Sequence, residues 1–473
     1  MVSRLGLAFL IIFTINCLPA IGQGVPNASS QPQVEALENS IQSLKAQIDE
    51  LTSVIRELKG EVQELRAGGA IYSPSAPSQS VATELAAQAQ EEQQLLNAKV
   101  EEQYQTKVES ASKYRVRLSG IVLLNLFNNR GVVDNPDFPS LVRERRPVDL
   151  ATSFGGSLRQ SMLGFEIFGP SIKSGRISAD AQFDFAGANS TSSYESPLGL
   201  LRLRTGVVRV TWPKTTVAAG QDVPFFSPLS PTSVASLALP AFSYSGNLWA
   251  WQPQLRVEHR LELGSNGGAL IQAGILSPVW SHQPAYATRI AWNRSAADRP
   301  LTIGAAGYYS RQDWGFNRNV DSWAGSTDWT IPLGQRWDLS GEFYRGRAVG
   351  QLGGGVDQII VLDGSIADPT TRVRGINSTG GWAQLKFRQT ERLEWNAALG
   401  QDNPHARDMR AFTLSQLSFP ERPVARNRSA MLNFIYRPRS DVLVSGEYRR
   451  IRTFTLHDSN SAHQISLSMG VLF

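Results

Sequence analysis

The chain has 473 residues, of which 41% are hydrophobic, and it carries a formal net charge of +5. This composition fits one large domain or several small ones and leaves that choice open. The one cysteine, Cys17, lies in the N-terminal segment described next. Once that segment is removed, a disulfide and a Cys-based metal site are both excluded.

The N-terminal segment has the pattern of a Sec signal peptide. Arg4 precedes an apolar run from Leu5 to Ile15, and Ala20 to Gly22 supplies small residues for cleavage. A run of about 11 apolar residues cannot span a hydrocarbon core of about 30 Å, and Asn16 fits a lipoprotein signal poorly. We therefore expect residues 1–22 to be a signal peptide. No later stretch is long and apolar enough for a transmembrane helix.

An unbroken heptad repeat predicts a coiled-coil oligomerisation segment over residues 34–66. Ile or Val fills every a position and Leu every d position, and the central members are Ile41, Leu44, Ile48, Leu51, Ile55 and Leu58. This regularity favours a coiled coil over a lone helix packed on a domain. β-Branched residues at a with Leu at d favour a two-stranded coiled coil, whereas Val54 at a g position widens the apolar stripe. The heptads therefore do not decide between two and three strands.

After a Gly/Pro/Ser linker at 67–80 and a second helix at 81–112, the hydrophobic period changes to two. The last segment illustrates the change: Ile465, Leu467 and Met469 alternate with Gln464, Ser466 and Ser468. Strands of about 10 residues with one apolar and one polar face are typical of transmembrane barrels. An antiparallel sandwich also alternates, so a second feature has to separate the two folds.

That feature is the connections, which alternate between short and long. Short turns fall near 169–174, 213–215, 264–268, 295–300, 333–336, 389–391 and 438–440; longer loops fall near 128–156, 186–198, 222–246, 280–285, 311–320, 347–376, 402–426 and 454–460. Aromatic residues accompany the short turns, namely Phe168, Trp212, Trp337, Phe387, Tyr436 and Phe473. Short periplasmic turns, long outer loops and an aromatic girdle indicate an all-β membrane protein: a 16-stranded antiparallel transmembrane β-barrel over residues 113–473.

Several motifs resemble those of the DcaP-like trimeric outer-membrane porins: a coiled coil before the barrel, Arg159 to Phe165 (RQSMLGF), Leu201 to Arg204 (LRLR), Ala219 to Gln221 and Gln252 to Arg256. Phosphate-selective porins are a near neighbour. The resemblance implies a homotrimer in the bacterial outer membrane, with its coiled coil in the periplasm, that takes up small anions such as dicarboxylates. The alternation ending in Phe473 resembles the signal read by the barrel-insertion machinery.

The charge of the predicted barrel also favours the passage of anions. Residues 1–112 hold 7 of the 46 basic and 13 of the 41 acidic residues, which leaves 39 and 28 for residues 113–473. Most of the 39 are arginine, whose guanidinium forks onto carboxylate or phosphate. Candidate lumen residues on polar strand faces are Arg202, Arg204, Arg256, Arg260, Lys386 and Arg388. Glu258 and Glu262 could neutralise two of these, and much of the arginine could instead bind outer-membrane lipid and lipopolysaccharide.

The loop near 222–246 has the sequence position of the third outer loop, which folds into the lumen of trimeric porins. It contains one acid, Asp222, and no base, so a constriction here leaves charge selectivity to wall arginines. Alternatives are a sugar channel stacking its solute on Trp249, Trp251, Trp280 and Trp314, and a tether to peptidoglycan. None of the five histidines lies in a hydrolase or metalloprotease motif. We expect no enzyme activity, cofactor, metal site or nucleic-acid partner.

Overall fold

The computed structural model describes residues 114–187, 199–264, 267–296, 299–412 and 424–473, so the predicted signal peptide, coiled coil, linker and second helix at 81–112 lie outside the described residues. The strands are β1 Arg115–Arg130, β2 Thr152–Ser157, β3 Met162–Ile172, β4 Gly175–Asp184, β5 Arg202–Thr211, β6 Thr215–Asp222, β7 Gln252–Glu262, β8 Gly267–Leu276, β9 Ala285–Ala296, β10 Arg299–Asp313, β11 Asn319–Leu333, β12 Trp337–Arg347, β13 Ile360–Leu362, β14 Val373–Gly375, β15 Asn377–Arg388, β16 Leu393–Pro404, β17 Val424–Arg439, β18 Val442–Thr455 and β19 Ser459–Leu472. Short helices are η2 Gly350–Leu352, η3 Gly355–Asp357 and α3 Ala406–Met409. Among the described segments, no helix has the length and apolarity needed to cross a bilayer.

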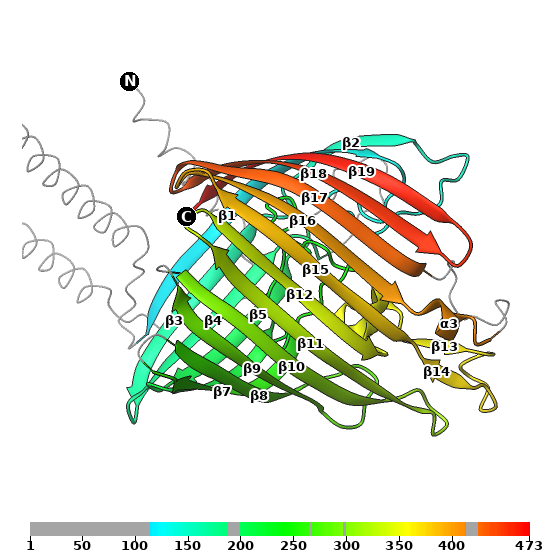
Figure 1. Ribbon diagram of the computed structural model, residues 1–473, viewed down its shortest axis with the longest axis horizontal. Helices are drawn as coiled ribbons and strands as arrows, with labels where there is room; N and C mark the ends of the chain where they lie inside the picture. The colour runs from blue at the N-terminus through cyan, green and yellow to red at the C-terminus, as the bar shows by residue number, and fades with distance from the viewer. Residues whose placement is uncertain (1–113, 188–198, 265–266, 297–298, 413–423) are drawn as a thin grey trace, which may run out of the picture. The chain divides into compact units, whose positions relative to one another are not determined.

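Antiparallel neighbours in chain order build one closed barrel (Figure 1). The ring closes because β1 pairs with β19 on one side and with β2 and β3 on the other. β2 covers the outer half of β1 and β3 the inner half, so these two segments together occupy one strand position. The 17 paired segments therefore form 16 positions, which confirms the predicted barrel.

The alternation of short and long connections is confirmed for most of the ring, but the outer connection between β18 and β19 (456–458) is as short as the inner turns, so the long loop predicted near 454–460 is wrong. We call the end with short turns, such as those after Ile172 and Arg439, the inner end, and the opposite end the outer end. The predicted loop at 128–156 was too long, because Thr152–Ser157 pairs with the outer half of β1. The connections named below are the first outer loop (131–151), the third (223–251) and the sixth (348–376), which contains η2, η3, β13 and β14.

Burial along the strands is inverted relative to a water-soluble sandwich. In β19, Gln464, Ser466 and Ser468 are buried, while Leu467 and Met469 on the other face are exposed. Exposed apolar side chains recur around the ring, and several aromatic ones lie at the inner end, including Trp337 stacked on Phe387 with ring centroids 4.4 Å apart. The apolar face therefore points outward to lipid and the polar face points into the lumen.

Leu467 tests this orientation. Leu467→Arg should destabilise the folded barrel by about 2–4 kcal/mol, because the charge would enter the hydrocarbon layer near its middle. Denaturant titration in bilayers, followed by heat-modifiable gel migration, measures the change. Leu467→Val keeps the apolar face and should leave stability nearly unchanged. Equal stability of Leu467→Arg and the parent protein would mean that this face does not meet lipid.

Candidate functional site

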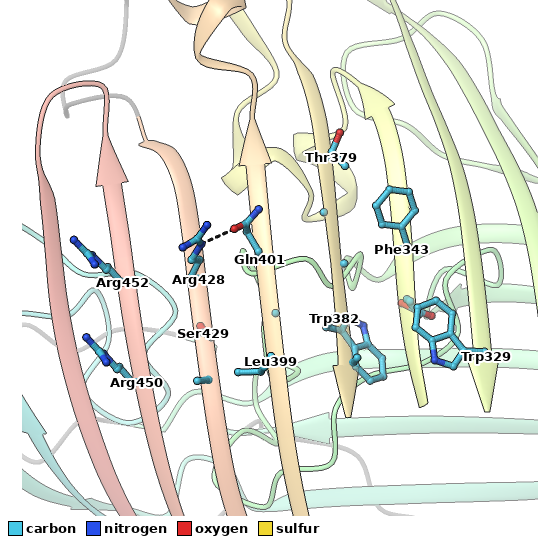
Figure 2. Close-up of a pocket in the computed structure, with 16 residues that line it drawn as sticks. Trp329, Phe343, Thr379, Trp382, Leu399, Gln401, Arg428, Ser429, Arg450 and Arg452 are labelled. Carbon is cyan, nitrogen blue, oxygen red and sulfur yellow. Dashed lines mark hydrogen bonds between the residues drawn. The ribbon is translucent and has the colours of Figure 1, made fainter. Parts of the chain in front are cut away.

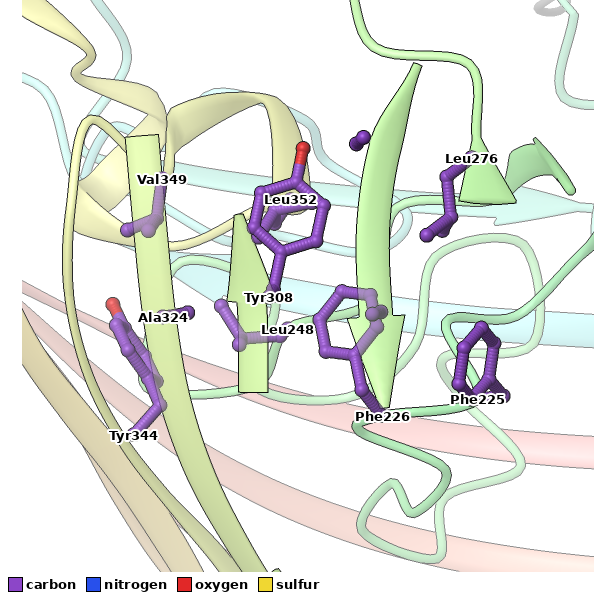
Figure 3. Packing of buried hydrophobic residues seen from close by; sticks show 11 residues of the cluster. Phe225, Phe226, Leu248, Leu276, Tyr308, Ala324, Tyr344, Val349 and Leu352 are labelled. Carbon is purple, nitrogen blue, oxygen red and sulfur yellow. The ribbon is translucent and has the colours of Figure 1, made fainter. Parts of the chain in front are cut away.

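The third outer loop lies inside the barrel rather than above it. Phe225, Phe226 and Leu248 of this loop are at most 3% exposed. They pack with Tyr308 and Tyr344 of the wall, and with Val349 and Leu352 of the sixth loop, in one apolar cluster (Figure 3). A wet 16-stranded lumen is too wide for wall side chains to fill, so this packing holds the loop across it.

Polar contacts attach the third loop to strands on one side of the lumen. Ser227 Oγ and the Leu229 N–H donate to the two carboxylate oxygens of Glu342, each at 2.7 Å. Further contacts join Thr232 to Gln384, Ser233 to Glu447, and Leu237 to Gln160 in the segment between β2 and β3. These partners come from β12, β15, β18 and the β2–β3 connection, so the loop spans a wide arc of the wall.

Glycine permits the closest approach between loop and wall. Gly246 has φ +102°, and a Cβ there would lie 2.3 Å from the Gly381 carbonyl oxygen. On the wall side, a Cβ at Gly400 would lie 2.4 Å from the Ser245 carbonyl oxygen. Any larger residue at either position would push the loop into the channel.

The wall not covered by these contacts carries the predicted pair Arg202 and Arg204. Arg202 donates to both oxygens of Asp184, at 2.6 and 3.0 Å, and to the Ala238 carbonyl of the third loop at 2.6 Å. Arg204 reaches the same carboxylate at 3.7 Å. Both guanidinium groups lie over the ring of Trp251, 5.3 and 4.9 Å from its centre. The two arginines therefore meet the edge of the third loop together, although a bulge in β5 interrupts their strand register.

Arg256 belongs to a second network, which continues along neighbouring strands. It is buried and bonds to Asp222 at 2.8 Å and to Glu258 at 2.7 Å. On one side, Arg209 contacts both Asp222 and Asp180. On the other side, Gln272 contacts both Glu258 and Arg289, and Arg289 pairs with Asp328. The complete network, in order of contact, is Asp180, Arg209, Asp222, Arg256, Glu258, Gln272, Arg289 and Asp328. Alternating signs make this network a rigid, nearly neutral band.

The remaining predicted residues lie toward the inner end. Lys386 and Arg437 both approach Glu394, at 3.6 and 3.8 Å, and Arg388 pairs with Asp338, which also binds Arg299. Arg260 is exposed near the short turn after β7. The six candidates thus lie in three separate parts of the wall rather than at one constriction, and Arg202 and Arg204 are both paired with Asp184.

Sequence reasoning did not identify Arg209 and Arg289 as lumen residues. It also did not predict that Trp251 contacts arginine or that Glu342 binds the third loop. Arg209 and Arg289 do alternate with outward apolar residues, so strand pattern alone could have placed them in the lumen. Their partners are distant in sequence, and no local pattern predicts them.

The four tryptophans proposed for sugar stacking form two separate pairs. Trp249 packs on Trp251, and Trp280 packs on Trp314 in exposed outer connections. Burial raises the pKa of Tyr244 in the third loop, so this ring stays neutral beside Trp249.

Within the described ranges, no three His, Cys, Asp or Glu side chains are grouped to hold a metal ion. Comparison with known proteins adds information on the fold alone. No family model and no curated protein sequence matches the chain. The outer membrane channel DcaP of Acinetobacter baumannii aligns with a TM-score of 0.60 and 15% identity, over 78% of this chain and 100% of DcaP.

Two further solved structures align less well. They are OmpT of Vibrio cholerae (TM-score 0.46, 10% identity, 78% of this chain and 100% of OmpT) and an anion-selective porin from Comamonas acidovorans (0.46, 9%, 76% and 100%). These scores are too low to support an argument. The likeness to DcaP confirms that the chain has the fold of an outer-membrane channel, and the predicted resemblance holds at low sequence identity.

The docking of the third loop gives a direct test. Glu342→Ala should weaken the docking of the third loop to the wall by about 1–3 kcal/mol, because two buried donors lose their acceptor. We expect a larger single-channel conductance with more current noise in planar bilayers. Glu391→Ala makes the same substitution in an exposed short turn and should behave as the parent protein does. Unchanged conductance in Glu342→Ala would mean that the loop does not limit the current.

Proposed function

We propose that this protein is a passive outer-membrane channel for small hydrophilic solutes, with a preference for anions such as dicarboxylates or phosphate. The observation that carries the proposal is the sharing of acids on the lumen wall. Asp184, Glu394 and Asp338 each serve two basic side chains. Each of these clusters therefore keeps an excess positive charge, which low-dielectric walls concentrate in the lumen.

The third loop favours the same selectivity. Its backbone and hydroxyl donors bind Glu342 and Glu447, which are 3% and 4% exposed, and Arg449 binds Glu447 at 2.6 Å. These acids are thereby separated from the solute path. Residues 223–251 themselves carry no charged side chain. The cluster of Arg202, Arg204 and Asp184 contacts the edge of the loop, where Arg202 donates to the Ala238 carbonyl.

The sugar-channel alternative is less well supported at the constriction. A sugar would stack on the face of a tryptophan, but the guanidinium groups of Arg202 and Arg204 lie over the Trp251 ring. An anion in the lumen can bind the N–H donors along the edges of those same guanidinium groups, which are planar and have several donors. The barrel supplies no argument for an enzyme, and absence of catalysis stays a prediction.

We further infer that residues 34–66 hold three barrels together from the periplasmic side and that Phe473 is read during insertion. The heptad pattern and the resemblance to trimeric porins support the assembly. Main-chain hydrogen bonds of 2.9 and 3.1 Å join Phe473 to Gly120 of β1, beside the closing seam. A role of the coiled coil as a tether to peptidoglycan is compatible with this proposal.

Selectivity can be tested at the shared acid. Replacing Arg202 and Arg204 together with Gln should move the reversal potential in a salt gradient toward cations, because Asp184 loses both partners. Asp184→Asn should move it in the opposite direction. The measurement belongs at low ionic strength, since the Debye length is only about 3 Å at 1 M salt.

A matched control removes two exposed arginines of the first outer loop, Arg143→Gln with Arg145→Gln, and should leave the reversal potential nearly unchanged. A cation preference of the parent channel under these conditions would contradict the anion proposal and would leave the porin fold intact.

The assembly role of the heptads predicts that deletion of residues 34–65 weakens oligomerisation and leaves a foldable barrel, since the barrel pairs its own backbone. Native mass and heat-modifiable migration report the two properties separately. As a control, deletion of the linker at 67–80 should retain the oligomer. An unchanged oligomer without the heptads would assign assembly to the barrel walls.

A further inference from the structure

Four arginines gather on the outward face of the barrel, outside the lumen. Arg426 and Arg428 come from β17 and Arg450 and Arg452 from β18, and the last three are exposed. The guanidinium groups of Arg426, Arg428 and Arg452 surround the ring of Phe454, 5.5, 5.6 and 4.7 Å from its centre. We call these four residues the outward arginine cluster. Among the described residues, none of the four forms an ion pair with an acid.

The cluster marks the level at which the outward face changes from apolar to polar. Toward the inner end, the next outward residues are Ala430 and Leu432 on β17 and Tyr448 on β18. The same change occurs on the neighbouring strands, from Leu399 to Gln401 on β16 and from Ile465 to His463 on β19. Since the apolar band meets lipid tails, the arginines lie at the level of the lipid headgroups in the outer leaflet.

A hollow continues from the arginines into the apolar band. Its volume is about 710 Å³; Phe343 and Trp329 line it on the side away from Arg428, Arg450 and Arg452, and Leu399 lies between the two groups (Figure 2). Small outward residues, Gly381 and Ala383, form its floor, and a second apolar hollow of about 590 Å³ adjoins it along Ala383 and Leu399. Glu342 also borders the first hollow, but its carboxylate is bound by the third loop on the lumen side.

We propose that this surface binds the phosphorylated headgroup of an outer-leaflet glycolipid of the lipopolysaccharide type, with an acyl chain in the adjoining hollow. Guanidinium groups bind phosphate through paired N–H donors, and the apolar hollow supplies the contact that an acyl chain needs. This proposal is independent of the selectivity of the lumen.

A second copy of the barrel is a poorer occupant on charge grounds. It would have to present acids to four arginines. On the described strands, outward acids are limited to Asp313, which binds His282, and Asp321, which accepts from Tyr309. The barrel wall therefore lacks a complementary acidic surface, whereas a phosphorylated lipid carries several negative charges.

The test measures binding of lipopolysaccharide to the full-length protein, purified in detergent and stripped of lipid. Arg450→Gln with Arg452→Gln should weaken binding by on the order of tenfold or more, since each headgroup-level arginine favours anionic lipid. Arg450→Lys with Arg452→Lys keeps the charge but not the planar fork, so we expect a smaller loss. Ala383→Phe, which fills the hollow and leaves the arginines in place, should also weaken binding. Arg143→Gln with Arg145→Gln should bind as the parent protein does.

Enzymatically dephosphorylated lipopolysaccharide should bind weakly and equally to the parent protein and to Arg450→Gln with Arg452→Gln. Heat-modifiable migration verifies that every variant is folded. Unchanged lipopolysaccharide affinity in the folded double Gln variant would overturn the proposal. Loss of oligomer mass in that variant, with lipid affinity intact, would overturn it as well and would assign the surface to a contact between copies.

Discussion

Closure of the sheet is the constraint on which the rest of this structure depends. In hydrocarbon, every backbone N–H and C=O needs a partner within the protein, and here β1 satisfies this by pairing with β19 on one edge and with β2 and β3 on the other. A ring of 16 positions encloses more space than wall side chains can fill. The polar interior and the loops that enter it follow from that size.

The lumen divides its charges between two kinds of surroundings. On the side where the third loop docks, buried Glu342 and Glu447 accept bonds from uncharged donors of the loop. On the opposite side, Asp184 serves both Arg202 and Arg204 above the Trp251 ring. The loop has no charged side chain, but its donors bind two of the acids on the lumen wall and leave Asp184 to the arginines.

The outer surface uses arginine differently from the lumen. Lumen arginines such as Arg256 and Arg289 are buried and paired with acids, so they are rigid and nearly neutral in sum. The outward arginine cluster has no such partners among the described residues and lies where the apolar band ends. The arginine excess of residues 113–473 therefore serves at least two environments, and a count of charges cannot separate them.

The sequence by itself determined the barrel, its strand number and its orientation, because alternation of Leu467 with Ser466 and the length of each turn are local properties of the chain. It also identified Arg202 and Arg204 as lumen residues, since both flank outward Leu203. Only the tertiary structure decided that both share Asp184, that Ser227 binds Glu342, and that Arg428 lies beside Arg452. These contacts join residues distant in sequence, and they depend on strand register, the β5 bulge and the path of a loop through the lumen.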